Sequence, residues 1–145
     1  MNFSKRLKAR TIKTILGFLL VGFSHSTWAM SNDVQLSDES RELDKIHNNS
    51  AWTNTLKNRY GVSEEKVNDF KEQGLQYSDI AIAEQLAKDT GKSASLVIRM
   101  HSDERKSWDD IARQLSIDPA HEGRVVADLR KELIVEQNNK TEDNK

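Results

Sequence analysis

The sequence predicts an all-α fold, a compact array of about six short helices built from a duplicated helix-turn-helix-like unit. Three observations lead to this prediction. Apolar residues recur every three or four positions between residues 50 and 136. Helix-capping Ser and Asp residues and helix-ending Gly residues punctuate the same region. No segment alternates apolar and polar residues over a useful length, so we expect no strands.

Length and composition limit the chain to one small domain. It has 145 residues, with 22 basic and 23 acidic residues, one Pro and no Cys. These values exclude a disulfide scaffold, a thiol enzyme, a multi-pass membrane protein and a Pro-rich linker protein.

Residues 1–29 have the order of a secretory signal peptide. Five basic residues and no acidic residue are followed by the apolar stretch 15–23 and by small residues at Thr27 and Ala29. We predict cleavage after Ala29 and a periplasmic or secreted protein. A retained membrane anchor is the alternative, but it requires about 20 apolar residues and this run is roughly half as long.

Removal of the leader changes the charge of the chain. It takes away five basic residues and no acidic ones, which leaves 17 basic and 23 acidic residues and a net charge of −6. An acidic surface repels nucleic acid and anionic lipid. We therefore expect no nucleic-acid partner and no stable membrane insertion after cleavage.

The rest of the chain divides into three parts. Residues 30–49 are mostly polar, so we expect a flexible lead-in with at most a transient helical turn around Leu43. Residues 50–136 form the expected helical domain, and residues 137–145 are read as a disordered tail by the same reasoning.

Six helices are expected within residues 50–136, and each begins at a capping residue. The first three would each end at a Gly in the left-handed conformation. The last is expected over residues 119–135, because Pro119 suits the first turn of a helix. The expected caps are Ser50, Ser63, Ser78, Ser93, Asp109 and Asp118, and the expected end points are Gly61, Gly74 and Gly91.

Two segments of the domain repeat one another. Residues 62–91 and 92–117 align with an offset of 30 residues at the first helix and 31 at the second, so one residue is inserted in the connecting loop. Neither unit alone can hide its apolar stripe, so we expect the copies to pack into one core. Matched pairs include Ser63 with Ser93, Phe70 with Met100, Tyr77 with Trp108, and Ile80 with Ile111.

The passages KEQGLQYSDIAIAEQLAKDTGKS and RKSWDDIARQLSI resemble a family of small, often exported bacterial proteins. Its units contain Glu-x-Gly-x-Gly-Trp-Gly-Glu-Ile-Ala stretches that alternate with Gly-Lys-Ser helix starts, and its function is uncharacterised. The resemblance covers residues 62–117 and implies a helical repeat fold without transferring an activity. This chain departs from the family at Ser78 and Asp109, where Gly is usual, and at Tyr77, where Trp is usual.

No catalytic or metal-binding pattern is present, so we predict that the protein is not an enzyme and has no cofactor or metal. Beyond the leader, the histidines His47, His101 and His121 lie in separate segments without a zinc signature. The chain lacks an EF-hand loop, a GxSxG motif and a Walker A sequence. We read Gly91-Lys92-Ser93 as a helix end followed by a helix cap.

Two functional hypotheses follow. The first is an exported interaction or structural module of the cell envelope that binds another envelope protein or itself, with Tyr77 and Trp108 as candidate partner-binding residues. The alternative is that both are core residues, which is the more common role of aromatic residues at helical spacing. The second is a helix-turn-helix nucleic-acid-binding protein, if the leader is not an export signal. The segment 111–133 has the pattern of a helix-turn-helix. The start of its second helix, however, has Ala120, His121 and Glu122 instead of side chains that read bases.

Overall fold

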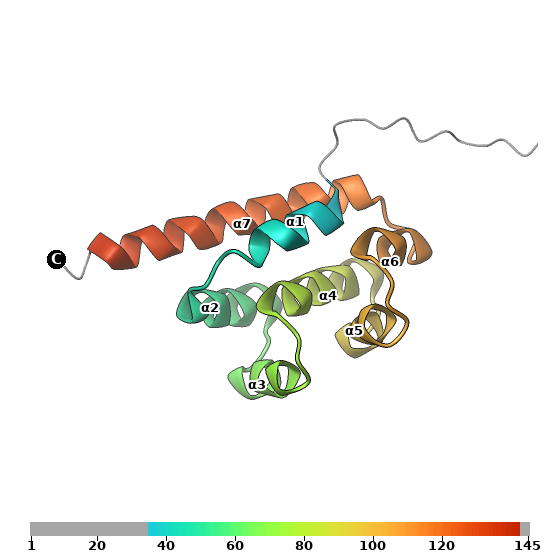
Figure 1. The fold of residues 1–145 in the computed structure, drawn as a ribbon, viewed down its shortest axis with the longest axis horizontal. Coiled ribbons are helices and arrows are strands. Elements are labelled where there is room, and N and C mark those ends of the chain that lie inside the picture. Colours follow the sequence, from blue (N-terminus) through green and yellow to red (C-terminus); the bar gives the residue numbers. More distant parts are fainter. Residues whose placement is uncertain (1–34, 143–145) are drawn as a thin grey trace, which may run out of the picture. The chain divides into compact units, whose positions relative to one another are not determined.

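Seven helices and no strand make up the part of the chain that the computed structural model describes, which is residues 35–142 with side chains as far as Asn138 (Figure 1). The all-α prediction is confirmed. The predicted signal peptide and its cleavage site at Ala29 lie outside these residues. The helices are α1 (Leu36–Leu43), α2 (Asn49–Tyr60), α3 (Glu64–Glu72), α4 (Tyr77–Thr90), α5 (Ala94–Ser102), α6 (Trp108–Gln114) and α7 (Pro119–Glu142).

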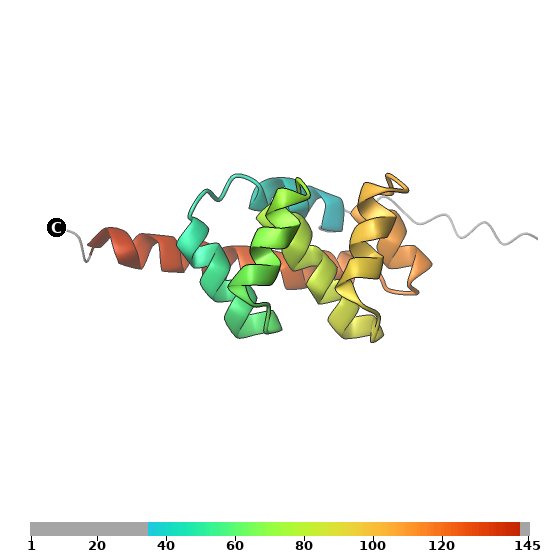
Figure 2. The same cartoon turned by 90° about the horizontal axis from the view of Figure 1, so that it is seen from below.

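The helices form three layers around one core. In Figure 1, α1 lies along α7, the helices α2, α4 and α6 form the middle layer, and α3 and α5 lie on the other side. Figure 2 shows the α3 and α5 side, with α7 running behind the other helices. The most extensive contacts join α1 to α7 and α4 to α5. Among the fully buried side chains are Leu36, Leu43, Trp52, Leu56, Ile80, Ile82, Ile111, Leu129 and Leu133.

A left-handed residue stands two positions before the cap of each helix from α3 to α7. These residues are Gly61, Gly74, Gly91, Arg105 and Ser116, with φ angles of 69°, 89°, 66°, 52° and 63°. The caps that follow them are Ser63, Gln76, Ser93, Ser107 and Asp118. The same kind of turn therefore joins each pair of consecutive helices from α2 to α7.

Three predicted helix caps lie two residues too late. Ser50, Ser78 and Asp109 all fall inside the first turn of their helices, where Ser and Asp are also common, so residue type alone did not locate the cap. The predicted caps Ser63 and Ser93 are confirmed, since they accept the N–H groups of Lys66 and Leu96. The residues that precede the other three helices are Asn48, Gln76 and Ser107.

The prediction of a flexible lead-in over residues 30–49 is wrong from Leu36 onward, because this segment contains α1. Leu36 and Leu43 are fully buried, and Ile46 is 8% exposed. Leu36 and Leu43 are seven positions apart and so fall on one face of α1, and α1 packs against α7. Burial against a distant helix thus supplies the stabilisation that the local composition lacks.

Side chains from two other helices hold the ends of α1. Asp109 Oδ1, on α6, accepts hydrogen bonds from the backbone N–H groups of Leu36 (3.0 Å) and Ser37 (3.4 Å). At the other end, the Ser78 hydroxyl on α4 donates to the carboxylate of Asp44. Ser78 and Asp109 occupy equivalent positions in the two units, 31 residues apart, so α1 bridges the units through the same position of each.

The last helix is longer than predicted. Instead of stopping at residue 135, α7 continues to Glu142 through most of the segment expected to be a disordered tail. No Gly or Pro interrupts that segment, and the Asn54 side chain on α2 donates to Glu136 at 3.1 Å. The exposed large apolar residues among those described are Ile134 and Val135.

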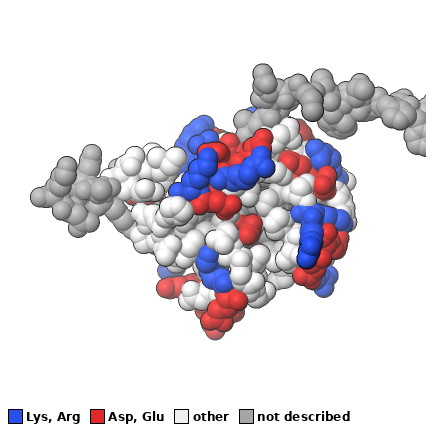
Figure 3. Space-filling model, in the orientation of Figure 1, with Lys and Arg blue, Asp and Glu red and all other residues white. Residues whose placement is uncertain are grey.

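Acidic and basic side chains are interspersed on the face drawn in Figure 3. Several pairs form surface ion pairs, which contribute little individually. The pair between Glu39 on α1 and Arg130 on α7 differs, because the Glu39 side chain is 9% exposed and Arg130 Nε lies 2.8 Å from its carboxylate. This pair adds a directed contact to the packing of α1 on α7.

Candidate functional site

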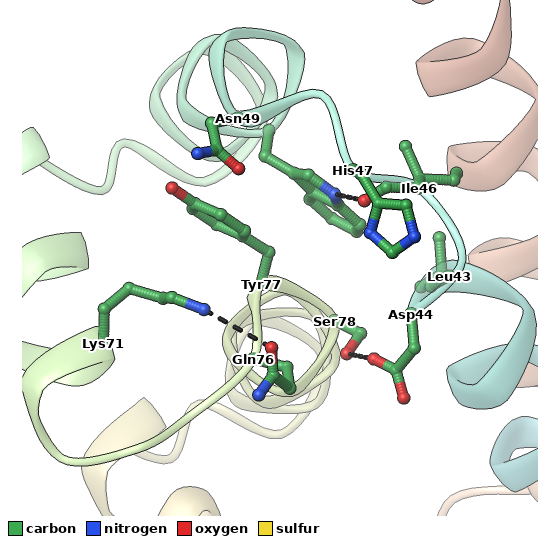
Figure 4. Close-up of a pocket in the computed structure, with 10 residues that line it drawn as sticks. Leu43, Asp44, Ile46, His47, Asn49, Lys71, Gln76, Tyr77 and Ser78 are labelled. Carbon is green, nitrogen blue, oxygen red and sulfur yellow. Dashed lines mark hydrogen bonds between the residues drawn. The ribbon is translucent and has the colours of Figure 1, made fainter.

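A cavity of about 130 Å³ opens at the start of α4 (Figure 4). Its lining comes from the end of α1 and the loop after it, the start of α2, the end of α3 and the first residues of α4. The residues are Leu43, Asp44, Ile46, His47, Asn49, Trp52, Lys71, Gln76, Tyr77 and Ser78.

Two stacked rings form the apolar part of this cavity. The ring centroids of Trp52 and Tyr77 are 5.8 Å apart and their planes differ by 7°. Trp52 is 1% exposed, and its indole N–H donates to the carbonyl oxygen of Ile46 at 2.9 Å. Tyr77 is half-buried and packs against the core. Because Trp52 is held by packing and by a hydrogen bond, it orients the Tyr77 ring that rests on it.

Polar groups surround the rings, and several have no hydrogen-bond partner within the described residues. These are the Tyr77 hydroxyl, the His47 imidazole and the side-chain amide of Asn49, which lies toward the hydroxyl end of Tyr77 in Figure 4. The Lys71 ammonium lies 4.6 Å from the Tyr77 ring centroid and donates to Gln76 Oε1 at 3.4 Å. The cavity therefore combines a rigid aromatic surface with donors and acceptors that a ligand can use.

The two candidate partner-binding residues, Tyr77 and Trp108, lie in different surroundings. Trp108 is 3% exposed and is a core residue, and its ring stacks on His101 with centroids 4.1 Å apart. His101 Nδ1 lies 2.8 Å from the Lys106 carbonyl oxygen, and Nε2 lies 3.6 Å from Asp79 Oδ1. Burial raises the pKa of the Asp79 carboxyl. Of Tyr77 and Trp108, only Tyr77 lines the cavity.

A partly buried polar network joins side chains of α2, α4 and α7. Glu122 is 2% exposed, and its Oε2 atom has no hydrogen-bond partner. Burial, together with the nearby carboxylate of Asp89, raises the pKa of Glu122 to about 7. Asp89 accepts from the Gln85 amide, which in turn accepts from the Tyr60 hydroxyl at 3.1 Å. Burial raises the pKa of Tyr60 to about 12.

Neither a metal site nor a membrane-spanning helix is found within residues 35–142. No group of three or more His, Cys, Asp or Glu side chains there is placed to hold a metal ion. His47 lies at the cavity, His101 lies against Trp108, and His121 is exposed at the start of α7. No helix within residues 35–142 combines the length and apolarity needed to cross a membrane.

The segment that resembled a helix-turn-helix corresponds to α6 and α7. A DNA-reading helix presents its first residues outward into the major groove. In α7, however, Pro119 and Glu122 are buried against the rest of the domain, and Arg124 is the exposed basic residue of the first two turns. No observation on these residues favours the nucleic-acid hypothesis.

Several residues of the cavity were not predicted from the sequence to belong to a site. Asp44, His47 and Asn49 lie in or beside the segment read as a flexible lead-in, and Trp52 was assigned only to a helical stripe. The spacing of Leu36, Leu43 and Ile46 is the sequence feature that fits a packed helix there, but the polar composition of the segment outweighed it in the prediction. Local patterns do not indicate that Lys71 and Tyr77 face this segment.

The interpretation of the cavity rests on its geometry. No protein-family model, no curated protein and no solved structure matches this chain.

Proposed function

We propose that this protein is an exported helical interaction module that binds another protein of the cell envelope through the cavity at Tyr77. The supporting observation is the set of unpartnered polar groups on Tyr77, His47 and Asn49 around the stacked rings of Tyr77 and Trp52. Cavities with an aromatic surface and a few convergent polar groups are typical of binding sites.

The size of the cavity favours one side chain of a protein partner over a large cofactor. A volume of about 130 Å³ holds roughly four water molecules, which is the space of one medium side chain. Tyr and Trp are enriched among residues that dominate protein interfaces, because they bury a large area at a small entropic cost. Lys71 adds a cation beside the ring that a partner carboxylate or carbonyl oxygen can approach.

Export is proposed from the order of residues 1–29, in which basic residues, an apolar run and small residues follow one another. Fractionation of cells, with mass measurement of the N-terminus, tests it. We expect a chain that begins at Met30 outside the cytoplasm. An intact N-terminus on a soluble cytoplasmic protein would contradict the export proposal.

Site-specific photocrosslinking tests the binding surface. A photoreactive amino acid at His47 or Asn49 should give the same adduct with an envelope protein, whereas the same amino acid at the exposed Lys131 should not. An adduct with twice the mass of the chain would identify a second copy as the occupant and contradict the choice of a different partner.

Two Tyr→Phe variants make this test specific. Tyr77→Phe keeps the ring and removes the unpartnered hydroxyl, so the adduct yield should fall by about three- to tenfold with no loss of thermal stability. Tyr60→Phe removes a hydroxyl that bonds to Gln85 outside the cavity, and it should leave the adduct unchanged. Equal yields from the two variants would contradict the proposed role of Tyr77.

A further inference from the structure

A second hollow, a groove of about 500 Å³, shares no residue with the Tyr77 cavity. It is lined by the end of α2, by α3 and α4, and by the start of α5. Its charged lining consists of Arg59, Lys66, Lys88, Lys92 and Glu84. Four basic residues against one acidic residue stand out in a chain whose total charge is −1.

Two of these basic side chains have acidic partners and two do not. Lys66 Nζ lies 2.8 Å from Glu84 Oε1, and Arg59 Nη1 lies 3.2 Å from Glu132 on α7. Arg59 nevertheless keeps one buried N–H group, Nε, without a hydrogen-bond partner. Lys88 and Lys92 are exposed and form no ion pair among the described residues. The positive charges of Lys88 and Lys92 therefore remain uncompensated in the groove.

Comparison of the two units shows why the start of α5 is more positive than the start of α3. The first unit has Glu64 and Glu65 in the first turn of α3, where acidic side chains compensate the positive end of the helix dipole. The equivalent residues at the start of α5, 30 positions later, are Ala94 and Ser95, and this first turn has no acidic residue. Lys92 stands where the first unit has a Val. Compared with the first unit, the second unit thus has two fewer negative charges and one more positive charge at the edge of the groove.

The pattern of charges indicates the chemical class of the ligand. A phosphate ester carries close to two negative charges and several acceptor oxygens, which suits the two unpaired ammonium groups of Lys88 and Lys92. A single carboxylate would leave one ammonium uncompensated. The volume is within the range of small-molecule sites.

We propose that this groove binds a small, soluble phosphate ester, with Lys88 and Lys92 as the principal contacts. The proposal is independent of the function proposed for the Tyr77 cavity, because the two hollows have no residue in common.

Titration of the full chain with inorganic phosphate and with glycerol 3-phosphate, followed by amide NMR shifts, tests the proposal. At constant ionic strength, the amides of Ala94 and Ser95 should shift saturably with phosphate and not with chloride. Lys88→Gln with Lys92→Gln should weaken binding by about tenfold or more. The matched double variant Lys57→Gln with Lys131→Gln removes the same charge outside the groove and should change the affinity less than about twofold.

Ser95→Glu separates binding from folding. It restores the carboxylate that Glu65 provides in the first unit, so it should abolish the phosphate-dependent shifts while the thermal midpoint stays equal or rises. Equal effects of phosphate and chloride, or equal affinities of the two double variants, would overturn the proposal. Binding to vesicles with anionic phosphate headgroups but not to glycerol 3-phosphate would overturn the choice of a soluble ligand.

Discussion

Tyr77 and Trp108 occupy equivalent positions in the two units but have different surroundings. Each is the first residue of its helix, and each stacks on another ring. Trp108 is covered on all sides, whereas Tyr77 is half-buried because its outer side lines the cavity. Of the two equivalent aromatic residues, Trp108 therefore packs in the core, whereas Tyr77 lines the candidate site.

Substitution by Ala should distinguish the two aromatic residues. Trp108→Ala should lower the free energy of unfolding by about 3–5 kcal/mol, because it leaves a cavity in the core. Tyr77→Ala should cost about 1–2 kcal/mol, since part of the ring is already exposed to water. Urea denaturation measures both values. A loss below about 1 kcal/mol for Trp108→Ala would mean that this residue is not a core residue.

Glu122 makes the stability of the native state depend on pH. Its pKa is about 7 in the folded chain, against an ordinary value of 4.5. As the pH rises through this window, the unfolded chain loses the proton first, so the folded state becomes less stable relative to it. The loss is absent below pH 4.5 and complete above pH 7, and it amounts to at most roughly 3 kcal/mol.

Glu122→Gln should remove this pH dependence. At pH 8 the variant should be more stable than the unmodified chain by up to roughly 3 kcal/mol, and at pH 4 the two should unfold at the same urea concentration. Urea denaturation at a series of pH values provides the measurement. Glu72→Gln, on the exposed side of α3, is the control and should leave the pH profile unchanged. A constant difference across the pH range would contradict the role of the Glu122 carboxyl.

The helices themselves follow from local chemistry, since their caps and left-handed end residues are set within a few positions of the chain. Ser63, Ser93, Gly61 and Gly91 were all located from the sequence. Ser116 was not, because a Ser with positive φ has no sequence signature comparable to that of Gly.

Substitutions at two equivalent turns should have opposite signs. Gly91→Ala should destabilise the chain by about 1 kcal/mol, and this cost is backbone strain alone, because an added Cβ would meet no atom within 4 Å. Ser116→Gly should stabilise it by about 0.5 kcal/mol, because relief of the left-handed strain exceeds the extra flexibility of the unfolded chain. Thermal unfolding gives both values. Destabilisation by Ser116→Gly would show that its hydroxyl or Cβ makes a needed contact.

The domain as a whole depends on α1, which bridges the two units and packs on α7. Its contacts combine buried Leu side chains, the Glu39–Arg130 ion pair and hydrogen bonds to Asp109 and Ser78. Ser78 and Asp109 stand at equivalent positions of the two units, and each holds one end of α1.

Leu43→Ala tests whether α1 belongs to the folded core. We expect a loss of about 2–5 kcal/mol in the free energy of unfolding, because Leu43 is fully buried. Lys45→Ala, two residues later and exposed, should change it by less than about 0.5 kcal/mol. Urea denaturation compares the variants. Equal free energies of unfolding for Leu43→Ala and Lys45→Ala would support the prediction that this segment is a flexible lead-in.

The sequence was sufficient for the all-α class, most of the helices, the Gly-ended turns and the duplication, because capping, periodicity and backbone preferences act over a few neighbouring residues. Tertiary structure decided the rest: the order in α1, the burial of Trp108 and the assembly of the Tyr77 cavity. Asp109 illustrates the reason, since its carboxylate caps a helix 73 positions away instead of its own. Burial and long-range hydrogen bonds depend on which distant segments meet, and no local pattern encodes that.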